Sequence, residues 1–90
     1  MTMRKFASQI VAIDGRNPHI RVDFAEELDE CITVAIKSTL EKIGSCINRV
    51  NMNISPEGKH YAIVYRHPCA TIEETLEETN QILNEYIFKT

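Results

Sequence analysis

The segment Ser55-Pro56-Glu57-Gly58 constrains the fold most, because its residue types predict a tight hairpin turn. Proline suits the second position of a type I turn, and glycine suits a left-handed position that follows it. Polar and apolar residues alternate on both sides of this turn, as they do in strands with one buried face. With Pro56 to Gly58 as the loop, Asn53 pairs with Tyr61, and every further pair follows from that register.

The expected register sorts the side chains of the hairpin into two faces, since directly opposed residues point to the same side of a sheet. The apolar face consists of Val50, Met52, Ile54, Ala62 and Val64. The other face holds the candidate binding residues, which are Arg49, Asn51, Asn53, Tyr61, Ile63 and Tyr65. A slip by one residue would exchange these partners and faces, so the interpretation depends on the register.

Two helices are expected from apolar residues that recur at spacings of three and four. The first has Asp23 as its N-cap, with acidic residues in the first turn, and runs to Ile43. Gly44 follows directly, and we expect it to adopt the left-handed conformation that ends many helices. The second helix opens at Thr71 with Glu74 three residues later, a spacing typical of a capping box.

Two further strands are predicted upstream, over residues 4–13 and 19–24. The element order is then ββαββα, and short connections favour both helices on one face of an antiparallel sheet. We therefore expect one α+β domain over residues 1–90, a two-layer sandwich of about four strands with one bare sheet face. The alternative omits the strand at 19–24 and has a truncated ferredoxin-like βαββα order.

Charge is distributed unevenly along the chain, although the net charge is only −3. The segment 23–43 has six acidic and two basic residues, and the segment 71–88 has five acidic residues and no basic one. The two expected helices are therefore acidic, whereas the strands and loops are basic. A charge run of this kind usually marks a solvated helix face.

Three cysteines at scattered positions favour reduced thiols in a cytoplasmic protein, because secreted domains of this size usually carry an even, denser set. No apolar run approaches the ~20 residues of a membrane helix. The first residues do not have the pattern of a secretory signal. We therefore expect neither membrane association nor secretion.

The strongest catalytic candidate is Cys69, which precedes the second helix and follows His67 closely. A thiol near a helix N-terminus and a histidine can act as a nucleophile. However, neither a third orienting residue nor a glycine-rich oxyanion loop is recognisable. His60, His67, Cys46 and Cys69 lack the paired spacing of zinc sites. We therefore expect no enzyme activity, no cofactor and no metal.

The expected function is that of a small non-catalytic binding or regulatory protein that forms a homodimer, or binds another protein, through the bare sheet face. Two strands are apolar on both sides, which predicts an exposed apolar patch of several hundred Å². An alternative is a single-stranded nucleic-acid-binding module on the same face, with tyrosines for stacking and amides for base edges. A ligand sensor or a cysteine-dependent enzyme is a third possibility.

Overall fold

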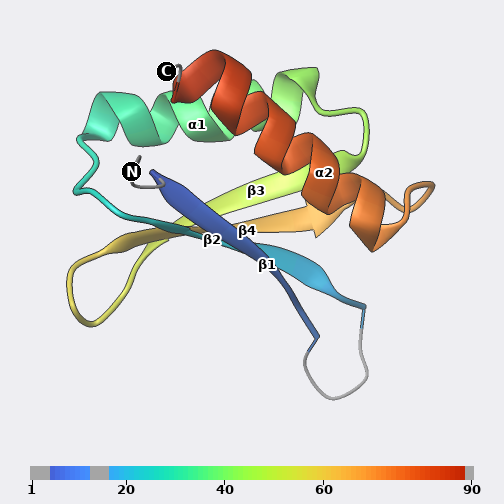
Figure 1. Ribbon diagram of the computed structural model, residues 1–90, viewed down its shortest axis with the longest axis horizontal. Helices are drawn as coiled ribbons and strands as arrows, with labels where there is room; N and C mark the ends of the chain where they lie inside the picture. Colours follow the sequence, from blue (N-terminus) through green and yellow to red (C-terminus); the bar gives the residue numbers. More distant parts are fainter. Residues whose placement is uncertain (1–4, 13–16, 89–90) are drawn as a thin grey trace, which may run out of the picture.

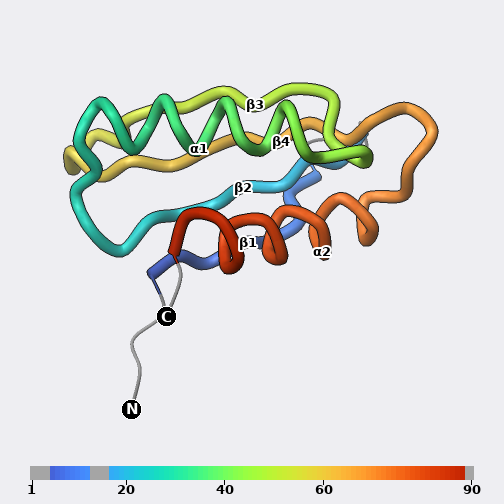
Figure 2. Tube along the Cα trace, turned by 90° about the horizontal axis from the view of Figure 1, so that it is seen from above, coloured from blue at the N-terminus to red at the C-terminus, as the bar shows by residue number. Residues whose placement is uncertain are grey.

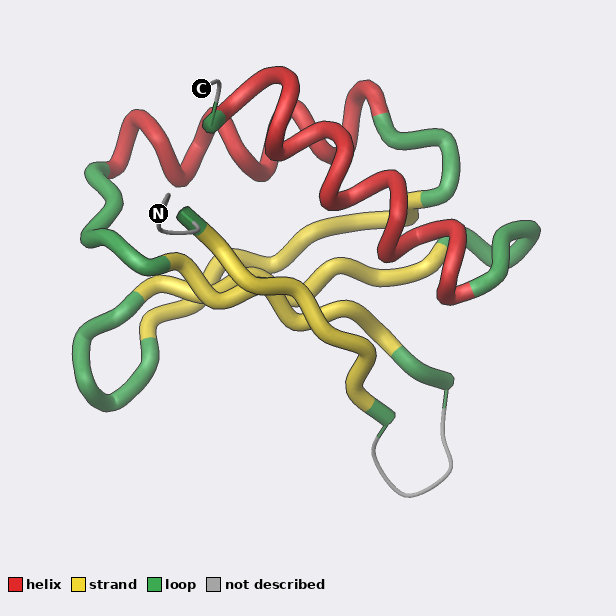
Figure 3. Tube along the Cα trace, viewed as in Figure 1, coloured by secondary structure: helices red, strands yellow, loops and turns green. Residues whose placement is uncertain are grey.

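The computed structural model describes residues 5–12 and 17–88, which form one antiparallel sheet and two helices (Figures 1 and 3). The elements are β1 (Phe6–Val11), β2 (His19–Phe24), α1 (Glu30–Ile43), β3 (Ile47–Ile54), β4 (His60–Arg66) and α2 (Ile72–Ile82), which continues as the π-helical turn η1 (Leu83–Ile87). The predicted α+β class and ββαββα order are confirmed. The strand predicted over 4–13 is found as β1, while its outermost residues Arg4 and Ile13 lie outside the described part.

The four strands are arranged in the order β1-β2-β4-β3, and each neighbouring pair is antiparallel. β2 and β3 are therefore parallel to one another with β4 between them, so that β2, α1 and β3 form a split βαβ unit. The three-strand alternative is wrong because β2 is formed. Its βαββα order nevertheless describes the chain from β2 to α2, and β1 adds a strand beside β2.

Both helices lie on the same side of the sheet, and the opposite face is bare (Figure 1). α1 packs on β3, whereas α2 contacts β1, β2 and β4 (Figure 2). The core between the layers is made of alternate strand residues and of inward-facing helix residues: Ile20, Val22, Phe24, Ile36, Leu40, Val50, Ala62, Val64 and Leu83. The predicted two-layer arrangement follows from this packing.

The hairpin register was predicted correctly. Asn53 pairs with Tyr61 and Arg49 pairs with Tyr65, with the intermediate pairs in step. Gly58 has φ +84°, the left-handed conformation expected at the end of this turn. The register shifts only between Ile47 and Arg49.

The start of α2 agrees with the prediction, whereas the start of α1 does not. Thr71 and Glu74 form both hydrogen bonds of a capping box. α1 begins at Glu30, and its N-cap is Asp29, whose carboxylate accepts the amide hydrogen of Ile32. Asp23 instead belongs to β2, because Phe24 continues the alternation of buried residues on that strand and is only 3% exposed.

Gly44 ends α1 for a reason other than the expected one. Its φ is −73°, so it is not left-handed. A Cβ at this position would lie 2.6 Å from the carbonyl oxygen of Leu40 and 2.7 Å from Cδ1 of Ile47. Glycine is needed here because α1 and β3 approach too closely for a side chain.

Candidate binding surface

The bare face of the sheet, called the open face below, carries a regular array of side chains from all four strands. It consists of Ala7, Gln9, Val11, His19, Arg21, Asp23, Arg49, Asn51, Asn53, Tyr61, Ile63 and Tyr65. The strand pairing arranges them in three rows across the sheet. All six candidate residues lie in this array, because the residues that alternate with them point into the core.

The two tyrosines of β4 are each covered by an arginine from a neighbouring strand. The guanidinium carbon of Arg21 lies 4.1 Å from the ring centre of Tyr61, and that of Arg49 lies 4.6 Å from the ring centre of Tyr65. Both distances are within the range of cation–π interaction. These contacts order the planar groups at the centre of the face without removing them from solvent.

His19, Arg21 and Asp23 on β2 complete the centre of the open face, and the prediction did not include them. The ring of His19 lies 5.9 Å from that of Tyr65. Arg21 forms an ion pair with Asp23 at 3.1 Å, and this hydrogen bond raises the pKa of Arg21 above its ordinary value. Their alternation with Ile20 and Val22 is the sequence signal that could have placed them on this face.

The open face is not the apolar patch that the sequence predicted. Its tyrosines and Ile63 are only partly exposed, since arginine and amide side chains lie around them. The large apolar side chains that are exposed lie elsewhere: Ile10, Ile32, Val34, Ile43, Ile54 and Tyr86. The surface therefore presents planar polar groups instead of a continuous apolar area.

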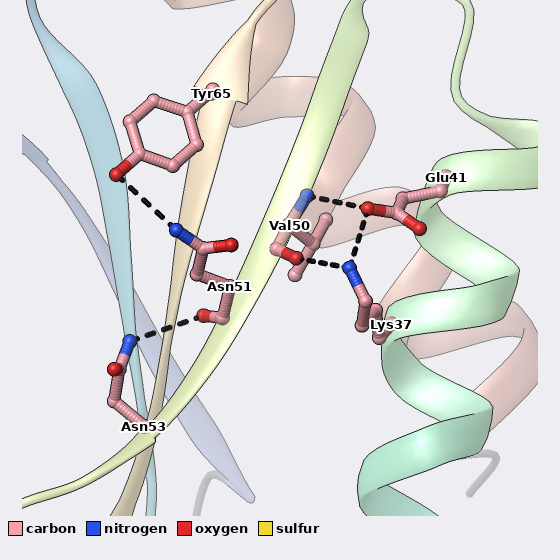
Figure 4. Close-up of polar contacts among 6 residues, drawn as sticks. All are labelled: Lys37, Glu41, Val50, Asn51, Asn53 and Tyr65. Atoms are coloured by element: carbon pink, nitrogen blue, oxygen red, sulfur yellow. Dashed lines mark hydrogen bonds and ion pairs between the residues drawn. The ribbon is translucent and has the colours of Figure 1, made fainter.

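Asn51 and Asn53 lie along β3, and the amide of Asn51 points toward Tyr65 (Figure 4). Nδ2 of Asn51 donates to the hydroxyl of Tyr65 at 3.5 Å, and Nδ2 of Asn53 donates to the carbonyl oxygen of Asn51 at 3.4 Å. Both hydrogen bonds are long, so they are weak ones. The two amides can exchange these bonds for stronger ones to a partner.

One end of the open face borders a hollow of about 620 Å³, lined in part by Asn48, Arg49, Tyr65 and Arg66. The guanidinium of Arg66 is used within the protein, because it donates to the carbonyl oxygens of His67, Pro68 and Ala70. Arg49 forms no ion pair with any described residue. It is therefore the cation that this end of the face offers to a ligand.

The residues considered for catalysis do not come together as a nucleophile and its base. Nδ1 of His67 accepts the backbone amide hydrogen of Cys69 at 3.0 Å, so this imidazole nitrogen is paired with main chain instead of with the thiol. All three cysteines lie in the described ranges and are free, as predicted. Among residues 5–12 and 17–88, no group of three or more His, Cys, Asp or Glu side chains could hold a metal ion.

Comparison with known proteins adds no further assignment, because no family model, curated protein or solved structure matches the chain. No helix in the described part of the chain has the length and apolar character needed to cross a membrane.

Proposed function

We propose that the chain is a non-catalytic binding protein whose binding surface is the open face, and that its partner is single-stranded nucleic acid. The observation that carries this proposal is the pair of tyrosines on a central strand, each beside an arginine. Aromatic rings on the central strands of an open four-stranded sheet stack bases in RNA-recognition domains. The likeness is general, because the chain lacks the glycine–aromatic motif of those domains.

The open face has side chains for each kind of contact that proteins make with a single strand, namely base stacking, hydrogen bonds to base edges and ion pairs with phosphate. Tyr61, Tyr65 and His19 offer rings that can stack on any base, in the case of the tyrosines once the arginine over each ring moves aside. Asn51 and Asn53 offer donors and acceptors for base edges. Arg49, without an ion-pair partner among the described residues, offers a cation for phosphate.

The acidity of the chain does not oppose this proposal as strongly as the net charge suggests. The acidic residues of α1 and α2 belong to the layer behind the sheet (Figure 1). Packed layers lie about 10 Å apart, whereas the Debye length at physiological ionic strength is about 8 Å. At physiological salt, charges on the helices are therefore partly screened from a strand bound to the open face, and they are screened less at low salt.

The test is the fluorescence anisotropy of a labelled single strand titrated with the protein at low and moderate salt. We expect binding that weakens as salt rises, because phosphate contacts release counterions. Tyr65→Ala and Arg49→Ala are expected to weaken it, with about 1–3 kcal/mol lost for the stacking residue. Tyr86→Ala is the matched control, since Tyr86 is 54% exposed on the helix layer. Absence of binding at low salt would refute the proposal.

A second candidate is a homodimer, or a complex with another protein, formed through the open face. Tyrosine and arginine side chains at the centre of the face favour it, because these types anchor interfaces. The array is about 19 Å wide and about 17 Å long, roughly 300 Å². A standard interface buries about 800 Å² per partner. The face alone is small for a stable dimer, so this candidate ranks second.

Ile63→Asp tests the second candidate. If the open face forms a dimer or binds a protein partner, this variant is expected to dissociate the dimer or abolish the binding while the chain stays folded. A regulatory role and a cytoplasmic location are the further elements of the expected function, and both remain predictions.

A further inference from the structure

The two edge strands, β1 and β3, each have main-chain N–H and C=O groups that point outward, away from the neighbouring strand. The two strands differ in whether these outward groups are hydrogen-bonded. On β3, both outward groups of Val50 are hydrogen-bonded by α1 (Figure 4). Nζ of Lys37 donates to the carbonyl oxygen of Val50 at 2.6 Å, and the amide of Val50 donates to Oε2 of Glu41 at 2.9 Å. The two side chains are themselves paired at 2.8 Å. They occupy the outward groups at the middle of β3, whereas the outward groups of Met52, nearer its end, have no side-chain partner among the described residues.

On β1, the outward groups can be identified from the pairing with β2. The amide of Ala25 donates to the carbonyl oxygen of Lys5 at 2.9 Å, so Lys5 turns its main-chain groups toward β2. Because these groups alternate along an antiparallel strand, Ala7, Gln9 and Val11 do the same. The main-chain groups of Phe6, Ser8 and Ile10 consequently point outward.

No side chain of the described residues forms a hydrogen bond with those outward groups of β1, in contrast to Val50. Ile10 is 43% exposed beside them. The Oγ of Ser8 is buried and has no hydrogen-bond partner within the described part. Between β1 and the helical segment formed by α2 and η1 lies a cleft of about 260 Å³, which is lined by Lys5, Phe6, Ser8, Asn80 and Asn84.

We propose that β1 pairs with β1 of a second copy in a weak dimer, antiparallel and around a two-fold axis at Ser8. Phe6 then lies opposite Ile10 of the second copy, and Ser8 lies opposite Ser8. The outward N–H and C=O groups of all three residues become hydrogen-bonded. The result is one continuous sheet with both pairs of helices on the same side.

β1 is self-complementary in this register, and this favours a second copy of the chain as the partner of β1. Each end of the pairing brings Phe6 against the exposed Ile10, so an apolar side chain is covered at both ends. The centre places Ser8 opposite Ser8, and a rotation of each side chain about χ1 would bring the two hydroxyls, which have no partner within the described part of the monomer, within hydrogen-bonding reach. Of the polar side chains that line the cleft beside β1, Asn80 and Asn84 are neutral, and Lys5 is paired with Glu26 at 3.1 Å. The two Lys5 side chains would lie at opposite ends of the pairing, so they would not face each other.

The dimer is independent of the nucleic-acid proposal, because the open face takes no part in the pairing. It would nevertheless join two open faces edge to edge into one surface. A strand that contacted both would bind more tightly than one contacting a single copy, through effective concentration alone.

The test is sedimentation of the intact chain over a concentration series, with variants at each edge. Ser8→Pro removes an N–H that the monomer does not use, and proline is tolerated on edge strands where the N–H faces outward. Ile10→Lys places a charge at the pairing. Each variant is expected to raise the dimer dissociation constant about tenfold or more. Ile54→Lys is the matched control, since Ile54 is 63% exposed on the opposite edge.

Amide hydrogen exchange supplies a second measurement that does not depend on a variant. We expect the amides of Ser8 and Ile10 to become protected as the protein concentration rises, while those of Met52 and Ile54 do not change. A chain that stays monomeric at about 500 μM, a concentration at which mass action favours even weak dimers, would overturn the proposal. A dimer that survives Ile10→Lys but dissociates with Ile54→Lys or Ile63→Asp would overturn it equally, by placing the interface at β3 or on the open face.

Discussion

The two faces of the sheet are built from alternate residues of the same strands, yet one face forms the core and the other forms part of the surface. On the covered face, Ile20, Val22, Val50 and Val64 have no exposed surface. On the open face, their chain neighbours are histidine, arginine, aspartate, asparagine, tyrosine and one isoleucine, Ile63. A shift of one position along a strand therefore separates a residue that holds the fold together from one that is free to bind.

The difference between the two faces is expected to be largest when the same charge is placed on each of them. Val64→Asp buries an unpaired carboxylate and is expected to destabilise the protein by about 3–5 kcal/mol, enough to unfold many domains. Ile63→Asp adds a carboxylate beside Arg21 on the open face and is expected to change stability by less than about 1 kcal/mol. Urea unfolding followed by circular dichroism measures both. Equal losses would show that the open face is covered.

A second test acts on the turn that sets the register. Gly58→Val is expected to cost about 1–2 kcal/mol, since a β-branched residue avoids the left-handed conformation. Its Cβ would meet no atom within 4 Å, so conformational strain is the whole cause. Gly58→Asn serves as the control, because asparagine tolerates this conformation. An unchanged unfolding midpoint for the valine variant would contradict the turn assignment.

A smaller effect on stability is expected for Glu41, which accepts a hydrogen bond from the Val50 amide at the edge of β3. The hydrogen bond from Lys37, with a further one from the Val50 amide, lowers the pKa of Glu41 below its ordinary 4.5. A carboxylate with a lowered folded pKa contributes stability that is present above the unfolded pKa and lost as the pH falls through the folded value.

Glu41→Gln is therefore expected to cost about 1 kcal/mol or less at pH 7, and this difference is expected to shrink near pH 3. Urea midpoints at both pH values measure it. Glu73→Gln, on the exposed side of α2, is the control and is expected to show no such change. A difference that persists in acid would mean that charge is not the cause.

The smallest effect is expected at Cys69, which lies on neither face. Its thiol is exposed and free. Cys69→Ser is expected to leave strand binding unchanged and stability within about 0.5 kcal/mol. A large loss of activity in a folded variant would overturn the non-catalytic interpretation.

Local signals predicted the parts of the fold that local chemistry determines. The turn residues set the register of β3 and β4, and the capping box set the start of α2. At the start of α1 the local signals were ambiguous, because Asp23 and Asp29 are equally good N-caps. Burial of Phe24 against the helices, a tertiary effect, decided between them.

The candidate surface could be predicted only as a set of residues sharing a face. The position of Arg21 and Arg49 over the tyrosine rings depends on side-chain conformation, and it changed an expected apolar patch into a polar one. The hydrogen bonds of Lys37 and Glu41 to the main chain of Val50 were also not predicted, although these two residues have the spacing of an ion pair on a helix. That they reach the neighbouring strand depends on how α1 sits over the sheet.

The stacking of Phe88 on Phe6 has a consequence for the order in which the molecule assembles. The two rings lie 5.6 Å apart, and Phe88 also approaches Phe24 at 6.0 Å. This contact joins the first strand to the residue after the last helical turn, so the chain must close nearly its whole length to form it. Loop closure of that size is entropically costly and slows folding relative to local contacts. The β3–β4 hairpin, with its short turn, is therefore expected to form early, and the docking of Phe88 on β1 to be among the last steps.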